Sequence, residues 1–235
     1  QGELKLAIEE LKNLSGSSRD QEVKVGALFQ IGGVYQDSGE FANAEETYKN
    51  ILKDYPGSYY SDYVQYQLGL VQLKKVDLTA AIASFKLIAK NYVQSKLLDD
   101  AAYSLGLAYF QREDYLAACN IFAKFQSEFK DSPLAGQALY MLGTCFVNLA
   151  KPTEALSVFK EITKLDLQDA ELLQKAEYGI ADCYYRLGLE KEALSQFKLL
   201  RAKYPASKFT TEIIWLLGQY YYKHNNLNMA GRYFS

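Results

Sequence analysis

Apolar and small residues recur along this chain with a period of about 37 residues. Each copy carries an apolar residue followed by a small one, and the steps between copies are 37, 37, 37, 38 and 37 residues. These pairs are Ile31-Gly32, Leu68-Gly69, Leu105-Gly106, Leu142-Gly143, Ile180-Ala181 and Leu217-Gly218. Twelve residues after the small residue stands an alanine, in the column Ala44, Ala81, Ala118, Ala155, Ala193 and Ala230. Four residues further stands an aromatic, in the column Tyr48, Phe85, Phe122, Phe159, Phe197 and Phe234. Aligned columns over six copies identify an internal repeat.

The spacing within each copy predicts two helices. Apolar residues recur at helical intervals in the first segment, as at Leu28, Ile31 and Tyr35. A ring stands three residues after the small residue in five copies, and Gln72 is the exception. Short breakers such as Ser38-Gly39 then separate this segment from a second one that holds the alanine and the aromatic. We expect the small residue and the alanine to lie where the helices cross, because larger side chains there would cost about 1–3 kcal/mol in overpacking.

Most copies end in a recurrent tail. The tail reads Tyr-Pro-x-Ser at residues 55–58 and 204–207, with related runs at 92–95 and 129–132. Proline ends the second helix, and the serine is predicted to lie in the N-cap region of the next one. The fourth copy has one extra residue around 166–169 instead. We interpret this as a loop insertion, with a hinge between two blocks as the alternative.

The order Leu-Gly-x-x-Tyr, Ala-x-x-x-aromatic and Pro resembles the tetratricopeptide repeat (TPR). Two features depart from that pattern: the period exceeds the usual 34 residues, and residues such as Leu28 and Gln65 stand where the repeat usually has tryptophan. The longer period, the tail and the run at residues 102–109 resemble a bacterial periplasmic and outer-membrane subgroup. That subgroup includes repeats of the Tol–Pal accessory protein and barrel-assembly lipoprotein type.

The predicted fold is all-α: a right-handed superhelical solenoid of stacked antiparallel helix pairs, with about six TPR-like repeats of 37 residues. We expect one solenoid over residues 1–235, in which 1–22 hold the second helix of an earlier repeat. The repeats are predicted at 23–60, 61–97, 98–134, 135–172, 173–209 and 210–235, the last one incomplete. Neither end shows the polar face that caps such arrays, so we expect a segment of a longer protein. An array whose last helices extend a little further is the alternative.

Each predicted first helix carries a second stripe of residues, at three before, one after and four after the small residue. These offsets share one helix face, and the resemblance implies that this face lines a concave groove. The first of these columns is aromatic in all six copies: Phe29, Tyr66, Tyr103, Tyr140, Tyr178 and Trp215. With Phe110, Tyr185, Arg186, Tyr222 and Lys223, these rings form the predicted partner-binding groove. Such rings are costly to leave bare, although they could instead pack between consecutive first helices and stiffen the array.

The groove chemistry favours a protein or peptide segment with apolar or aromatic residues, docked as a strand or an amphipathic helix. Only Lys175, Arg186 and Lys223 are predicted to be able to hold a carboxylate, and Asp182 partly offsets them. A net charge of −2 and the lack of a repeated basic column argue against nucleic acid.

Catalytic and metal sites are not predicted, and neither is a cofactor. The single histidine, His224, is expected to be a solvated turn residue, and one histidine excludes most His-based triads. Cys119, Cys145 and Cys183 are predicted to be buried core thiols. The longest charge-free stretch near the C-terminus, Ile213 to Tyr222, is too short to span a bilayer.

We therefore predict a non-catalytic protein-interaction scaffold, a fragment of a larger bacterial envelope protein that takes part in a larger complex. A structural spacer that uses the ring ladder only for packing is the alternative, and single-stranded RNA binding is a third. The resemblance favours a periplasmic location, whereas the lack of a disulfide pattern also fits the cytoplasm.

Overall fold

The computed structural model describes residues 2–165, 169–207 and 209–234. Within these residues the chain forms thirteen α-helices and no strand, which confirms the all-α class. The chain consists of two compact units, Gln1–Ile121 and Phe122–Ser235. The expectation of a single solenoid over residues 1–235 stays a prediction.

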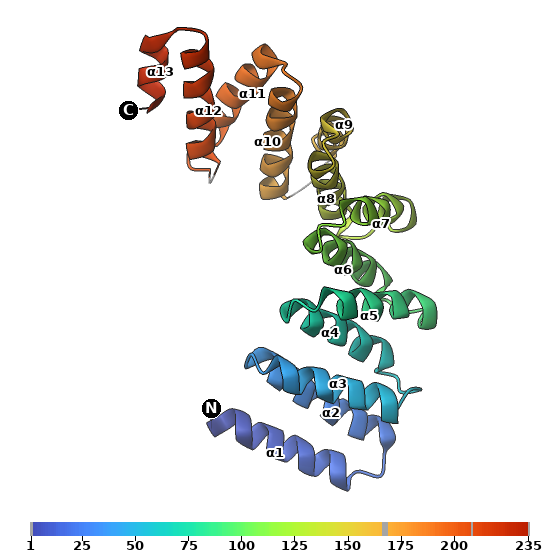
Figure 1. The fold of residues 1–235 in the computed structure, drawn as a ribbon. Helices are drawn as coiled ribbons and strands as arrows, with labels where there is room; N and C mark the ends of the chain where they lie inside the picture. Colours follow the sequence, from blue (N-terminus) through green and yellow to red (C-terminus); the bar gives the residue numbers. More distant parts are fainter. Residues whose placement is uncertain (1, 166–168, 208, 235) are drawn as a thin grey trace. The chain divides into compact units, whose positions relative to one another are not determined.

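Unit 1 is a succession of helices in which each of the first five packs on the helix that follows it. Its helices are α1 (Gly2–Ser17), α2 (Gln21–Asp37), α3 (Phe41–Asp54), α4 (Ser61–Lys74), α5 (Leu78–Asn91), α6 (Leu98–Gln111) and the start of α7 (Tyr115–Glu128). The pairs α2–α3 and α4–α5 form hairpins (Figure 1). The helix α1 packs on α2 much as α3 packs on α4, and the assignment of residues 1–22 to the second helix of an earlier repeat stays a prediction.

Unit 2 begins within α7, at Phe122, and repeats this arrangement. Its helices are α8 (Ala135–Asn148), α9 (Pro152–Ile162), α10 (Ala170–Arg186), α11 (Glu190–Lys203), α12 (Thr210–Lys223) and α13 (Leu227–Phe234). Hairpins form from α8–α9, α10–α11 and α12–α13 (Figure 1). We call α2, α4, α6, α8, α10 and α12 the first helices, and α3, α5, α7, α9, α11 and α13 the second helices.

Two first helices are longer than the others. The helices α2 and α10 have 17 residues each, whereas α4, α6, α8 and α12 have 14. They begin at Gln21 and Ala170, slightly before the predicted repeat starts at 23 and 173. The side chains of Asp20 and Asp169 cap them by accepting hydrogen bonds from backbone N–H groups. Of the predicted insertion or hinge at 166–169, residues 166–168 lie outside the described residues, and Asp169 is the N-cap of α10.

The aromatic ring of the second helix packs against the small residue of the first helix in the same hairpin. A Cβ added at Gly32 would lie 2.3 Å from Cε1 of Tyr48, and one added at Gly69 would lie 2.5 Å from Cε1 of Phe85. Both rings are only 1% exposed. The expected lack of space is confirmed, and the group that fills it is the ring sixteen residues later in the same hairpin. Phe159 also reaches the next hairpin, because a Cβ at Gly179 on α10 would lie 2.6 Å from its Cε2.

Each hairpin turn is made by a residue with positive φ, seven positions after the small residue. These residues are Gly39, Val76, Glu113, Ala150, Gly188 and Asn225, with φ between 55° and 77°. At Val76 the turn is closed by a bond from Asp77 N to Gln72 O and one from Val76 N to Leu73 O, each 2.9 Å. This is the left-handed helix ending that favours glycine. The predicted tight turns are therefore confirmed, although valine occupies one of these strained positions.

The tail serines lie in the predicted N-cap region, two residues before the N-cap position itself. The residues at the N-caps of α4 and α6 are Tyr60 and Leu97, which make no side-chain cap bond. Ser58 Oγ instead accepts from Tyr60 N at 3.2 Å and donates to Glu22 Oε2 at 2.6 Å. Because Glu22 lies on the preceding first helix, the serine joins consecutive hairpins.

Gln72 breaks the ring column because it belongs to a buried polar network in unit 1. Its Nε2 donates to Glu45 Oε1 at 3.4 Å, and its Oε1 accepts from Ser84 Oγ at 2.7 Å. Glu45 also pairs with Lys49 at 2.6 Å and with Lys75. Burial raises the pKa of Glu45, but hydrogen bonds from Lys49 and Lys75 outweigh it and lower the pKa to about 2. The network links α3, α4 and α5 through a charged group.

Candidate functional site

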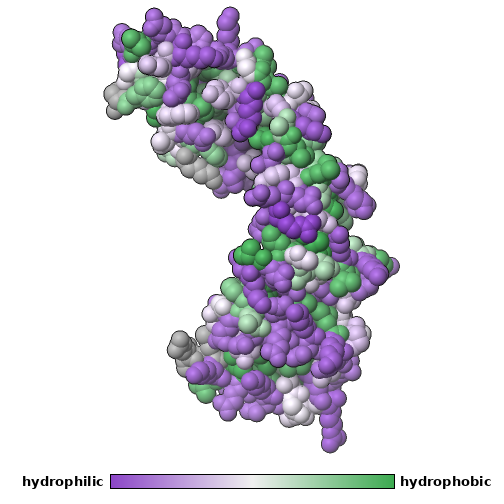
Figure 2. Space-filling model, viewed as in Figure 1, coloured by the Kyte–Doolittle hydropathy of each residue, from purple (hydrophilic) through white to green (hydrophobic). Residues whose placement is uncertain are grey.

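The predicted groove rings differ in exposure between helices. In the column three before the small residue, Phe29, Tyr66, Tyr103, Tyr140 and Tyr178 are half-buried, and Trp215 is 52% exposed. In the column four after it, Phe110 is half-buried, whereas Tyr185 and Tyr222 are 51% and 66% exposed. Figure 2 shows hydrophobic side chains interspersed with hydrophilic ones on the visible face of each unit.

Four of the half-buried rings pack against the second-helix aromatic of their own hairpin. Ring centroids are 5.9 Å apart for both Phe29–Tyr48 and Tyr66–Phe85. In unit 2 the separations are 5.7 Å for Tyr140–Phe159 and 6.3 Å for Tyr178–Phe197. One edge of each of these rings therefore forms part of the hairpin core.

Several of these rings also contact the following hairpin. The hydroxyl of Tyr66 lies 3.3 Å from Ser104 Oγ on α6. Tyr178 stacks on Phe209, at the start of α12, with centroids 4.4 Å apart and planes 12° apart. Burial and the Glu212 carboxylate raise the pKa of the Tyr178 hydroxyl. These contacts are those expected if the ladder packs between hairpins, and they account for much of its aromatic character.

The exposed rings gather on α10 and α12. On α12 all three groove positions, Trp215, Gln219 and Tyr222, are exposed. On α10 Tyr185 is exposed, whereas Asp182 is half-buried. The structure thus leaves uncovered aromatic surface on the C-terminal first helices of unit 2.

The predicted basic group is already paired with carboxylates of the chain. Arg186 Nε lies 2.6 Å from Asp182 Oδ2, and Lys175 Nζ lies 2.9 Å from Glu171 Oε1. Lys223 pairs with Glu190 at the start of α11. Arg186 and Lys175 have their carboxylate four residues earlier on the same helix, so these pairs require no partner.

A pocket of about 190 Å³ lies between α11 and α12 in unit 2. Sequence reasoning predicted three of its lining residues, Tyr185, Tyr222 and Lys223, but not the pocket itself. The other lining residues are Glu190, Ala193, Leu194, Phe197, Leu216, Leu217, Gln219 and Tyr220. Both helices of one hairpin, α10 and α11, and the first helix of the next, α12, contribute residues to it. Sequence spacing within one hairpin therefore gives no signal for the pocket.

The described residues provide little for catalysis. Cys119, Cys145 and Cys183 are buried thiols, and burial raises the pKa of Cys183 to about 12. A thiol with that pKa is not a nucleophile near neutral pH. His224 is exposed as expected, and it stacks on Tyr220 with centroids 4.3 Å apart. No cluster of three or more His, Cys, Asp or Glu side chains suited to a metal ion occurs within these residues.

The same described part of the chain contains no helix that combines the length and apolar character needed to cross a membrane.

Similar solved structures share the fold. The C-terminal part of a TPR repeat-containing protein from Cytophaga hutchinsonii aligns with a TM-score of 0.77 at 12% identity, covering 98% of this chain and 88% of that one. MamA aligns at 0.65 with 22% identity, covering 77% of this chain and 92% of that chain. YrrB, described as a TPR protein with an unusual peptide-binding site, aligns at 0.57 with 22% identity, covering 80% and 89%. No curated protein matches the chain.

Two family models match the sequence. Residues 26–58 match a tetratricopeptide repeat model. Residues 61–219, more than half of the chain, match the model named YfiO and described as an outer membrane lipoprotein. Both matches agree with the repeats, hairpin turns and ring-filled glycine positions described above. The chain therefore belongs to the YfiO family of outer membrane lipoproteins and is built from tetratricopeptide repeats.

Proposed function

We propose that this chain is a non-catalytic scaffold that binds a partner protein segment on the groove faces of its first helices. The observation that carries the proposal is the exposure of Trp215 and Tyr222 on α12 and of Tyr185 on α10. Tyrosine and tryptophan combine a large apolar body with a polar tip, and they are enriched among residues that dominate binding energy at interfaces. The partner segment accordingly carries apolar or aromatic side chains.

The family matches and the fold are independent support for this proposal. TPR-type folds suggest protein-interaction scaffolds, and YrrB is described as having a peptide-binding site. The YfiO match supports a place in the bacterial envelope. We propose that the chain lies in the periplasm, with the cytoplasm as the alternative location. We also propose that it belongs to a larger complex.

The spacer function is the second candidate, and the packing of the half-buried rings favours it. Phe29 and Tyr66 contact rings of the second helices, and Tyr66 also contacts the next first helix. We assign these rings to stiffening of unit 1. Binding is assigned to the exposed rings of α10 and α12, so the two functions use different members of the same columns.

Selection from a random-peptide display library tests the binding proposal. We expect enrichment of peptides with aromatic or branched aliphatic residues, and a loss of affinity of about tenfold or more in Trp215→Ala. The matched control is Leu199→Ala on α11, because Leu199 is 55% exposed and Trp215 is 52% exposed. Equal binding by both variants, with helical content preserved, would show that the groove assignment is wrong.

A further inference from the structure

We propose that the pocket between α11 and α12 binds one bulky apolar side chain of the partner segment, with an acidic side chain beside it in that segment. This inference rests on the proposed function and specifies the chemistry that the site recognises. It uses the pocket residues, whereas Trp215 is not among them.

The size and lining of the pocket fit a single ring or branched aliphatic side chain. Its apolar walls come from Leu194 and Phe197 on α11 and from Leu216 and Leu217 on α12. A volume of about 190 Å³ exceeds the roughly 150 Å³ of an apolar protein cavity that holds benzene. The pocket therefore accepts one side chain, while the exposed rings of Tyr185 and Tyr222 at its edge are available to the neighbouring backbone.

The pocket lies at a junction that differs from the preceding one at a repeat position facing the second-helix ring. At the preceding junction, Gly179 stands two residues before the small residue, and its lack of a side chain lets the ring of Phe159 approach α10. At the junction of α11 and α12 the corresponding residue is Leu216, and the ring is Phe197. Leu216 and Phe197 both line the pocket, whereas at the preceding junction the ring of Phe159 lies against the backbone at Gly179.

The charged rim of the pocket consists of a Glu190 carboxylate that is paired through both oxygens and a lysine that has further N–H donors. Glu190 pairs through Oε1 with Lys223 Nζ and through Oε2 with His224 Nε2, the latter at 3.0 Å. The Lys223 side chain is 71% exposed, and that of Glu190 is 32% exposed. An ammonium group carries three N–H donors, so Lys223 can bond a second carboxylate while it keeps Glu190. This charge complementarity selects an acidic residue next to the apolar one in the partner.

Blocked dipeptides test the two parts of this recognition separately. The probes are N-acetyl-Glu-Phe-amide, N-acetyl-Gln-Phe-amide and N-acetyl-Glu-Ala-amide, titrated into the ¹⁵N-labelled full chain and followed by amide chemical shifts. For ligands of this size we expect a Kd of about 1–10 mM. The Glu-Phe probe should shift the signals of Leu194, Leu216 and Tyr222, bind about threefold or more tightly than the Gln-Phe probe, and outcompete the Glu-Ala probe.

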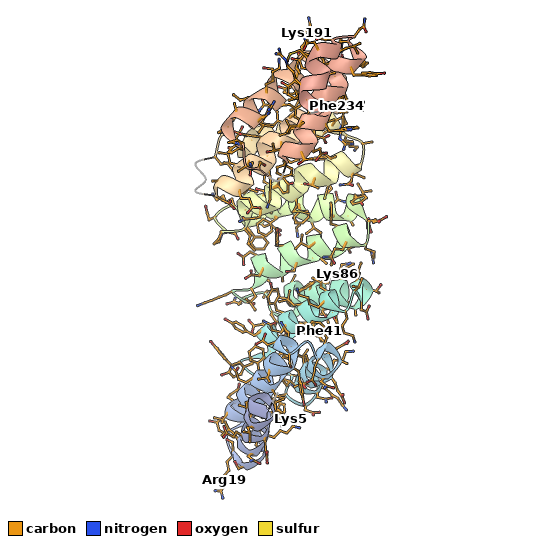
Figure 3. All side chains as sticks on the ribbon, turned by 90° about the vertical axis from the view of Figure 1, so that its left-hand side faces the viewer. Lys5, Arg19, Phe41, Lys86, Lys191 and Phe234 are labelled. Atoms are coloured by element: carbon orange, nitrogen blue, oxygen red, sulfur yellow. The ribbon has the colours of Figure 1, made fainter. Side chains whose placement is uncertain are left out.

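Variants of the chain identify the group that binds the carboxylate of the probe. Lys223→Gln should abolish the difference between the Glu-Phe and Gln-Phe probes. Lys191→Gln should preserve it, because Lys191 is an exposed lysine of the same unit that does not line the pocket (Figure 3). Leu216→Trp should fill the pocket and weaken all phenylalanine probes.

Several results would overturn the inference. Equal affinity of the Glu-Phe and Gln-Phe probes would contradict recognition of an acidic residue. Chemical-shift changes confined to residues outside the pocket would contradict binding in the pocket. Tighter binding of N-acetyl-Gln-Phe with a free C-terminal carboxylate would assign the rim to a chain terminus instead. Library peptides that depend on Trp215 but bind Leu216→Trp normally would contradict the pocket while leaving the proposed function intact.

Discussion

The neighbouring glycines Gly32 and Gly33 on α2 allow the packing of the repeat to be measured directly. A Cβ at Gly32 would lie 2.3 Å from Cε1 of Tyr48 and 2.8 Å from its Cζ, whereas a Cβ at Gly33 would meet nothing within 4 Å. The Tyr48 ring is 1% exposed and fixed in the core. Gly32→Ala is therefore expected to overpack the hairpin, and Gly33→Ala is not.

The two substitutions share the same gain in helix propensity, about 1 kcal/mol from glycine to alanine. Gly33→Ala should therefore raise the free energy of unfolding by up to about 1 kcal/mol. Gly32→Ala has the same gain but adds an overpacking cost of about 1–3 kcal/mol. The difference between the two variants isolates that cost, since the propensity contribution cancels. Urea denaturation followed by far-UV circular dichroism measures both.

Repeating both glycine substitutions in a Tyr48 variant tests whether the Tyr48 ring causes the overpacking cost. In a Tyr48→Leu background the atoms nearest to the added Cβ are absent, so the difference between Gly32→Ala and Gly33→Ala should shrink toward zero. Equal effects of the two glycine substitutions in the parent chain would refute the reasoning. A difference that survives in the Tyr48→Leu background would assign the clash to another group.

Two further predictions concern backbone strain and pH. Val76→Gly should raise the thermal midpoint of unfolding. The relief of a valine in the left-handed conformation, about 1–2 kcal/mol, exceeds the entropic cost of glycine, about 0.5–1 kcal/mol. Gly188→Val at the equivalent turn should lower the midpoint. Glu45 has a pKa lowered from 4.5 to about 2, so its contribution, about 3 kcal/mol, is present above pH 4.5 and lost as the pH falls toward 2. Acid titration of Glu45→Gln should therefore show a smaller loss of stability between pH 5 and 2 than the parent, and identical titrations would contradict the ion-pair network.

The repeat, its hairpins and their turns could be predicted from sequence because they depend on local periodicity. The small residue at the helix crossing follows from a fixed spacing within one hairpin, whereas the identity of the group that meets Gly32, the ring of Tyr48, is a finding of the structure. The strained turn at Val76 could not be predicted from residue type, since valine disfavours positive φ. Only the column shared with Gly39 and Gly188 indicates it.

The groove could be predicted only in part, because exposure depends on contacts between hairpins. Periodicity placed Tyr66 and Trp215 in one column, yet Tyr66 is half-buried and Trp215 is 52% exposed. The i,i+4 spacing of Asp182 and Arg186 is visible in the sequence, but nothing in the spacing of Lys223 indicates that Glu190 of the preceding hairpin pairs with it. The exposure of a ring and the pairing of a charged side chain depend on residues of other turns and hairpins. The sequence of one helix face does not identify those residues.

Photo-cross-linking of a library-selected peptide tests the central claim most directly. A benzophenone amino acid is placed in turn at Tyr222 on α12 and at Leu199 on α11, both exposed positions of unit 2. Binding on the groove faces predicts strong cross-linking from position 222 and background from position 199, with competition by unlabelled peptide only at 222. Equal cross-linking from the two positions, or stronger cross-linking from 199, would contradict the account.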